Sequence, residues 1–135
     1  MSKAISNKNV ADAKFAPAPF DGPFKAALGR PELKGSWLIF GKSGSGKTTF
    51  ALQLAKYLTR FVDKVAFDSL EQGLSLSMQK AWKRVDMAAA GSKVIFLDKE
   101  SLPELRDRLS KRKSPNVIII DSVICLVGMR LADYQ

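Results

Sequence analysis

The sequence contains no histidine, and it contains one cysteine among its 135 residues. Without histidine, the chain cannot supply a Ser-His-Asp triad or a histidine-ligated metal site from its own residues. The single cysteine, Cys125, excludes an internal disulfide and fits a reducing, cytoplasmic setting. No apolar run approaches the roughly 20 residues that a membrane-spanning helix needs, and no apolar stretch follows Lys3 as it would in a signal peptide. We therefore expect a cytoplasmic protein without a membrane segment.

Acidic residues are scarce relative to basic ones, 13 against 22, which gives a formal net charge of +9. Such an excess favours polyanionic partners, nucleic acid first. Two basic groups lie on predicted helices: Lys80, Lys83 and Arg84 in the first, and Arg106, Arg108, Lys111, Arg112 and Lys113 in the second. Because helix surfaces are normally charged, the same residues also fit an ordinary solvated surface.

Residues 1–30 lack a regular apolar pattern and are rich in proline and small polar residues. Such a composition is typical of an extended or disordered segment. We therefore predict an N-terminal arm over residues 1–30 and one folded domain over residues 31–135.

Beyond the arm, short apolar runs alternate with helical patterns. The runs predict strands at 36–40, 64–68, 93–97 and 117–121, and the patterns predict helices at 47–61, at 74–85 and after a capping box at 101–104. The expected inward-facing residues are Phe50, Leu54, Tyr57, Leu58 and Phe61 on the first helix, Leu74, Met78, Ala81, Trp82 and Val85 on the second, and Leu102, Leu105 and Leu109 on the third. Strands that alternate with helices predict an α/β fold, a parallel sheet with helices on both faces.

A glycine-rich segment between the first predicted strand and helix reads G-K-S-G-S-G-K-T, from Gly41 to Thr48. It matches the P-loop pattern G-x-x-x-x-G-K-[ST] in full, and its strand-to-helix setting is the one that this motif requires. Glycines let the backbone wrap a phosphate, the helix N-terminus attracts anions, Lys47 reaches the β and γ phosphates, and the Thr48 hydroxyl ligates Mg²⁺. The predicted nucleotide-binding residues are Gly41, Lys42, Ser43, Gly44, Ser45, Gly46, Lys47, Thr48 and Thr49. We expect Lys42 to be solvated, not catalytic.

Acidic residues follow two of the predicted strands. Asp121 ends the apolar run V-I-I-I-D, where open parallel sheets bind ligands, and it is a candidate Walker B aspartate for Mg²⁺. A carboxylate that caps the following turn is the simpler alternative. Glu71, in F-D-S-L-E-Q-G, is a candidate base that polarises the attacking water, and Asp68 is a weaker one. An acidic loop or a helix cap would explain both residues without catalysis.

Taken together, these motifs resemble those of the RecA-like ATPases, including DnaB-type helicases and phage-encoded recombination ATPases. The resemblance rests on Gly46-Lys47-Thr48-Thr49, on the acidic segment that ends in Glu71, and on Asp121-Ser122. It extends from Trp37 to about Val127. It implies that the protein binds ATP with Mg²⁺, that Lys47 contacts the phosphates and that Glu71 activates the attacking water. It also implies that several copies assemble on DNA in recombination, replication or repair.

The chain departs from the family pattern after Asp121. Family members continue with a strand that lies between the P-loop strand and the Walker B strand, followed by DNA-binding loops. Because that strand is missing from the sequence pattern, we expect a truncated domain with an unfilled sheet centre, which would favour self-association. No arginine finger is assigned, although Arg130 is available.

Other functions remain open at this point. A small-molecule P-loop kinase shares the same loop but would need an acceptor-binding region and a basic lid. A nucleotide-binding fragment without turnover is the last alternative. The signature L-S-G-G-Q of ABC-transporter subunits is absent. An ATPase that acts on single-stranded DNA is our first hypothesis.

Overall fold

The computed structural model describes residues 4–38, 46–121 and 124–127 of the chain. The chain divides into two compact units, residues 1–33 and residues 34–135. The first unit contains two short helices, α1 (Asn7–Asp12) and α2 (Gly22–Leu28), within the segment that we expected to be an extended or disordered arm. In the described residues, no helix has the length and apolar character needed to span a membrane.

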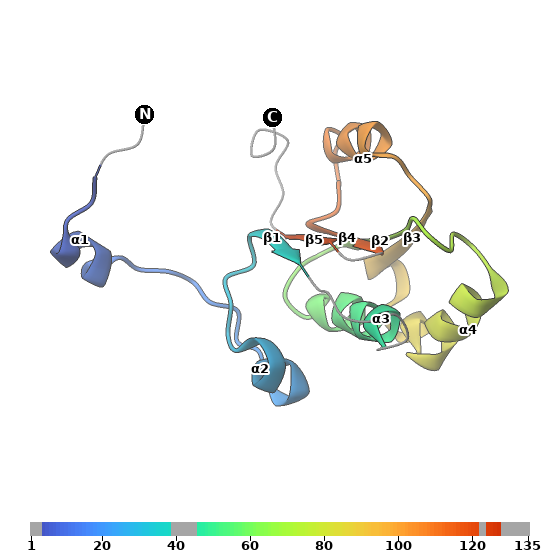
Figure 1. The fold of residues 1–135 in the computed structure, drawn as a ribbon, viewed down its shortest axis with the longest axis horizontal. Coiled ribbons are helices and arrows are strands. Elements are labelled where there is room, and N and C mark those ends of the chain that lie inside the picture. The colour runs from blue at the N-terminus through green and yellow to red at the C-terminus, as the bar shows by residue number, and fades with distance from the viewer. Residues whose placement is uncertain (1–3, 39–45, 122–123, 128–135) are drawn as a thin grey trace. The chain divides into compact units, whose positions relative to one another are not determined.

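The second unit is built on a five-stranded sheet. Its strands are β1 (Gly35–Leu38), β2 (Val65–Ser69), β3 (Val94–Asp98), β4 (Val117–Asp121) and β5 (Ile124–Val127). Their spatial order is β1-β5-β4-β2-β3, as the ribbon in Figure 1 shows. The central strands β4, β2 and β3 are parallel, as the alternation of strands and helices predicted.

The slot between β1 and β4 is occupied, so our expectation of an unfilled sheet centre is wrong. The strand β5 lies there and pairs antiparallel with both neighbours, with Trp37 opposite Cys125 and Cys125 opposite Ile119. Only two residues separate β4 from β5, too few for the crossover that a parallel strand requires. The unfilled sheet centre was our reason to predict self-association, so that reason no longer holds. Self-association itself stays a prediction.

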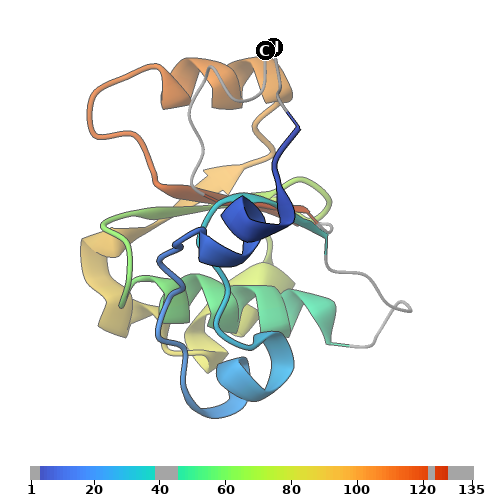
Figure 2. The ribbon, with the colours of Figure 1, turned by 90° about the vertical axis from the view of Figure 1, so that its left-hand side faces the viewer.

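Helices cover both faces of the sheet. On one face lie α3 (Lys47–Leu58), α4 (Leu76–Arg84) and a 3₁₀ segment, Met87–Lys93, and on the other lies α5 (Leu102–Leu109) (Figures 1 and 2). The predicted capping box of α5 is present, because the Ser101 hydroxyl accepts from the Glu104 amide and the Glu104 carboxylate accepts from the Ser101 amide.

The two faces of the sheet carry separate apolar clusters. Under α5, the cluster consists of Ala66, Leu97, Leu105, Ile118 and Ile120. On the other face, Phe67, Trp82 and Phe96 pack as an aromatic group, with ring centroids 5.5 to 6.5 Å apart. Residues of β2 therefore alternate between the faces, as a strand requires.

The buried faces of the helices differ in part from the predicted ones. On α3 the buried residues are Ala51, Leu52, Leu54, Ala55 and Leu58, while Phe50 and Tyr57 are half-buried. Phe61 is also half-buried and lies beyond the end of the helix. On the other helices, Met78, Ala81 and Leu105 are buried as predicted, but Leu74 and Leu102 are largely exposed. Both exposed leucines lie at or before the first helical turn, where the chain enters from a loop.

Candidate functional site

The described part of the phosphate-binding segment is the start of α3. Gly46 adopts φ 86°, a left-handed conformation that favours glycine, and α3 begins at the next residue. Lys47, Thr48 and Thr49 form its first turn and are half-buried. The remaining predicted residues of this segment, Gly41, Lys42, Ser43, Gly44 and Ser45, lie outside the described residues. The first amides of a 12-residue helix thus stand at the site, and such amides attract anions.

A hydrogen bond joins the two motifs that the sequence analysis singled out. The Thr48 hydroxyl donates to Asp121 Oδ2 at 3.1 Å, across 73 residues of sequence. Asp121 is the last residue of β4, and α3 packs against β2 and β4. The fold therefore places the hydroxyl of the helix start and the carboxylate of the strand end in direct contact.

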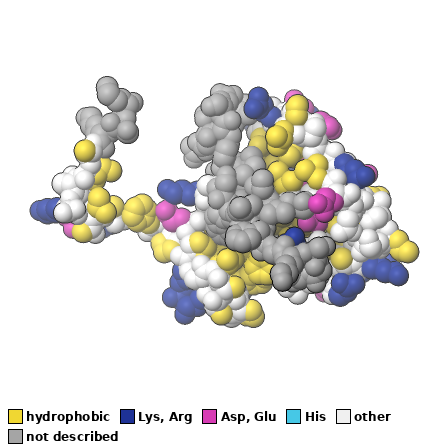
Figure 3. Space-filling model, viewed as in Figure 1, with side chains coloured by type: hydrophobic (Ala, Val, Ile, Leu, Met, Phe, Trp, Pro, Cys, Tyr) yellow, Lys and Arg dark blue, Asp and Glu magenta, His cyan; other side chains and the backbone are white. Residues whose placement is uncertain are grey.

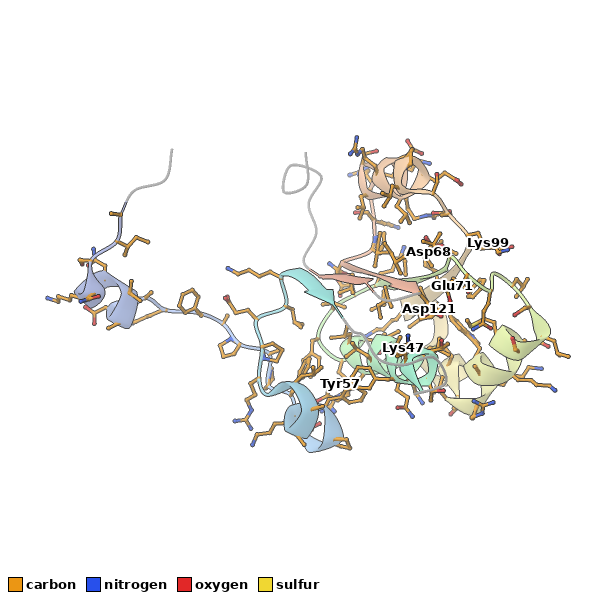
Figure 4. The ribbon with its side chains drawn as sticks, viewed as in Figure 1. Lys47, Tyr57, Asp68, Glu71, Lys99 and Asp121 are labelled. Atoms are coloured by element: carbon orange, nitrogen blue, oxygen red, sulfur yellow. The ribbon has the colours of Figure 1, made fainter. Side chains whose placement is uncertain are left out.

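Glu71 is held at the same end of the sheet. The Leu70 and Glu71 amides both point to the Asp121 carbonyl, with N–O distances of 2.8 and 3.4 Å. Figure 4 shows Glu71, Asp121 and Lys47 together at this end, each from a different element. The Glu71 side chain is exposed, so it is accessible from solvent.

The loop that carries Glu71 is also tied to β3. The Leu74 amide donates to Asp98 Oδ1 at 3.0 Å, and Asp98 is the last residue of β3. Gly73 has φ +61°, and a Cβ at this position would stand 2.5 Å from Asp98 Oδ1. The loop therefore needs glycine here, and it is fastened to two neighbouring strands, one on each side of β2.

The charges around Asp121 have opposite effects on its protonation. Burial raises the pKa of Asp121 above its ordinary value, and the nearby Glu71 carboxylate adds to this rise. The hydrogen bond from Thr48 and the positive charge of Lys47 lower the pKa in part. A cation bound at this position would favour the ionised carboxylate, since opposite charges stabilise each other.

Asp68 is not part of this group. It is fully buried, and its register partner is Ile120, a member of the cluster under α5, so its side chain faces away from Asp121 (Figure 4). Asp68 Oδ1 accepts from the Glu100 amide at 2.9 Å, and Glu100 forms an ion pair with Arg108 of α5. Its contacts thus fix the β3–α5 connection.

The pKa of Asp68 predicts how the stability of the fold depends on pH. Burial raises this pKa from 3.8 to about 6, helped by the nearby Glu100 and Glu104 carboxylates. The folded protein binds the proton more tightly than the unfolded chain does. Stability from this group is therefore fully present below pH 3.8 and is lost as the pH rises through about 6.

We expect Asp68→Asn, which cannot ionise, to escape that loss. From pH 4 to pH 8, the free energy of unfolding of the variant should gain about 1 to 2 kcal/mol on that of the parent. Denaturant unfolding at several pH values measures this difference. Asp63→Asn, at an exposed position, is the control. A difference between Asp68→Asn and the parent that does not change with pH would contradict the argument.

The donor atoms at the Thr48–Asp121 contact fit a magnesium ion. Mg²⁺ prefers oxygen ligands and is held by one or two carboxylates together with substrate phosphates and water, not by a cage of protein side chains. The contact offers one hydroxyl and one carboxylate, and the Ser69 hydroxyl is buried nearby without a hydrogen-bond partner. In the residues that the structure describes, no three His, Cys, Asp or Glu side chains gather in a way that could hold a metal.

The basic residues of the second unit differ in how they are used. Arg108 pairs with Glu100 and Lys111 with Asp107, so the second basic group is partly neutralised. On α4, by contrast, the exposed Lys80, Lys83 and Arg84 form no ion pair with any residue that the structure describes. Figure 3 shows basic side chains in small separate groups on the visible face.

The sequence analysis missed Asp98 and Ser69. Asp98 ends a strand, as Asp121 does, and this position was the available signal. Ser69 follows Asp68, and the alternation of a strand places the two side chains on opposite faces. The register of β2 and β4 decides which of these two side chains lies on the same face as Asp121. The sequence pattern does not contain this register.

Comparison with known proteins shows what the second unit is similar to. The DNA repair and recombination protein RadB of Methanosphaera stadtmanae is 31% identical over 102 residues, which cover 70% of this chain and 44% of that protein. The chain thus spans less than half the length of this relative. No solved structure gives a significant match. Residues 37–134, from β1 to beyond β5, match the AAA family, the ATPase family associated with various cellular activities. With its P-loop pattern, its α/β sheet and this match over most of its length, the chain belongs to the AAA family of P-loop ATPases.

Proposed function

We propose that this chain binds ATP with Mg²⁺ between the start of α3 and the ends of β2 and β4, and that it is the nucleotide-binding part of a RecA-like ATPase. The observation that carries the proposal is the hydrogen bond from Thr48 to Asp121. It brings the hydroxyl of the P-loop pattern to the carboxylate at the strand end, and these are the two protein groups that the metal in such ATPases requires.

Binding of the triphosphate follows from the groups at the helix start. The first amides of α3 lie at its N-terminus, where the helix dipole attracts anions, and there they donate to phosphate oxygens. The Lys47 ammonium adds a charge-assisted contact to the terminal phosphates. Thr48 would ligate Mg²⁺ through its hydroxyl and Asp121 would hold the ion through a water molecule, and the bound ion would neutralise charge on the phosphate oxygens.

Hydrolysis needs a group that orients a water molecule and accepts its proton. We assign this role to Glu71, because its carboxylate is exposed at the same end of the sheet and acts electrostatically on Asp121. Both ends of its loop are fixed, by the Asp121 carbonyl and by Asp98. Such anchoring holds a catalytic group in position before the substrate arrives.

For the polymer on which the ATPase acts, we propose single-stranded DNA in recombination or repair. The similarity to RadB, whose name states a role in DNA repair and recombination, and the net charge of +9 support the proposal. The exposed basic residues of α4 are the part of the described surface best suited to phosphates. Contacts of this kind carry no base information and weaken steeply with salt.

Two measurements on the wild-type chain test the proposal. Calorimetry with ATP should show binding that requires Mg²⁺ and that is lost when a chelator is added. Fluorescence anisotropy of a labelled single strand should rise with protein at low salt and much less at physiological salt.

The outcomes separate the parts of the proposal. Absence of ATP binding in the presence of Mg²⁺ would overturn the site itself. Absence of an anisotropy change at low salt would remove DNA as a partner of this chain and leave nucleotide binding. ATP binding without hydrolysis, with or without DNA, would identify a nucleotide-binding fragment that does not turn over, while phosphate transfer to a small acceptor would favour the kinase alternative.

A further inference from the structure

The Ser69 hydroxyl is a buried polar group without a hydrogen-bond partner. Ser69 has no exposed surface, and its Oγ makes no hydrogen bond with any residue that the structure describes. A buried hydroxyl without a partner costs about 1 to 3 kcal/mol, so folded proteins seldom keep one unless a ligand or water completes it. In the described part of the chain, the other such atom is Asp68 Oδ2, which lies on the opposite face of the sheet.

The register of the sheet places Ser69 beside Asp121. The two residues are partners in the parallel pair β2–β4, and paired residues of parallel strands point to the same face, with the strands about 4.8 Å apart. Asp121 binds the Thr48 hydroxyl, so this face is the one that carries α3. The Ser69 hydroxyl therefore stands on the same side as Thr48 and Asp121, at the same end of the sheet.

The backbone of Ser69 leads directly into the loop of Glu71. The Ser69 carbonyl accepts from the Gly73 amide at 3.1 Å, and the Leu70 amide binds the Asp121 carbonyl. Ser69 is thus fixed on both sides, and a small shift of its backbone to bring the hydroxyl to a protein acceptor would break these bonds. A ligand bound in the site could reach the hydroxyl without disturbing these backbone bonds.

A small buried residue could also be present only to fill space. In that case alanine would serve equally well, since it has nearly the same volume and leaves no polar group unpaired. The two explanations differ in what they predict for ligand binding, because a filler has no effect on the metal.

We propose that Ser69 is a further residue of the magnesium–nucleotide site, and that its hydroxyl accepts a hydrogen bond from a water molecule of hydrated Mg²⁺ bound to a nucleoside triphosphate. The inference rests on the proposed function. Mg²⁺ keeps several of its waters when it binds to proteins, and these waters need acceptors on the protein. Asp121 supplies one such acceptor and Ser69 supplies a second from the neighbouring strand.

The variant Ser69→Ala tests the inference through two readouts of opposite sign. Without ligand, the melting temperature should stay the same or rise, because an unpaired buried hydroxyl is removed. With Mg²⁺ present, the affinity for a non-hydrolysable ATP analogue should fall by about 3- to 10-fold, the effect of one lost hydrogen bond. In a chelator, any residual affinity for the analogue should equal that of the parent.

The matched control is Ser110→Ala. Ser110 follows α5, and its hydroxyl donates to the Asp107 carbonyl. This variant should bind the analogue as the parent does. If the parent itself fails to bind the analogue with Mg²⁺, the proposed function is overturned. If the parent binds and Ser69→Ala binds equally well, only the inference about Ser69 is overturned. A loss of affinity that is the same with and without Mg²⁺, or a clear fall in the melting temperature, also overturns it.

Discussion

Replacing Glu71 by glutamine is expected to lower the rate of ATP hydrolysis by about 100-fold or more while the affinity for ATP changes little. Loss of a general base costs on the order of 10²- to 10⁴-fold in rate, because glutamine cannot accept the proton of the attacking water. Glutamine keeps the shape of the side chain, and the bonds that hold the loop come from backbone amides. Single-turnover hydrolysis and calorimetry, in a preparation whose parent hydrolyses ATP, measure the two quantities.

The control for this variant is Glu104→Gln. Glu104 belongs to the capping box of α5, on the far face of the sheet, and glutamine also serves in such a box. Its rate of hydrolysis should match that of the parent. If Glu71→Gln hydrolyses ATP as fast as the parent, the base is a different residue.

The change Lys47→Ala should weaken ATP binding by about 30-fold or more, which corresponds to about 2 kcal/mol. The lysine supplies a charge-assisted contact to phosphate, and alanine leaves the phosphate charge without its partner. Alanine is the best helix-forming residue, so the first turn of α3 should be preserved. Calorimetry with Mg²⁺-ATP measures the effect directly.

An exposed lysine provides the comparison. Lys80→Ala, on α4, removes the same charge from the protein but no contact at the site, so its ATP affinity should equal that of the parent. Equal affinities of Lys47→Ala and the parent would show that the phosphates bind elsewhere.

Local sequence patterns predicted the strands that form the parallel part of the sheet. The predicted run 117–121 coincides with β4. Strands β2 and β3 each begin and end one residue later than the predicted runs. Buried parallel strands are continuous apolar runs, and such runs are visible without knowledge of their neighbours. The start of α5 was predicted for a similar reason, because a capping box is a local interaction.

The position of β5 could not be predicted in the same way. Its residues I-C-L-V form an apolar run like the others, but nothing in the run states which strands it pairs with or in which direction. We expected an unfilled sheet centre, whereas β5 lies there and pairs with both β1 and β4. Strand pairing is a property of the whole sheet.

The candidate site was predicted in its parts, and its geometry was not. Thr48 and Asp121 were identified from motifs, and the fold brings them into contact. Which of Asp68 and Ser69 lies on the same face as Asp121 depends on the register between β2 and β4. A shift of that register by one residue would exchange the two side chains, which is why a weaker catalytic candidate turned out to lie under α5.

The antiparallel strand β5 also affects the order in which the protein can form during synthesis. Among the described strands, β1 pairs only with β5, and Gly35 lies opposite Val127. Strand β1 is made before the other described strands of the sheet but has no ladder to join until β5 has emerged from the ribosome. Pairing between distant segments is slow because the long intervening loop must close first. On a nascent chain, β1 would therefore become ordered only after β2, β3 and β4 can already pair with one another, although those three strands are made after it.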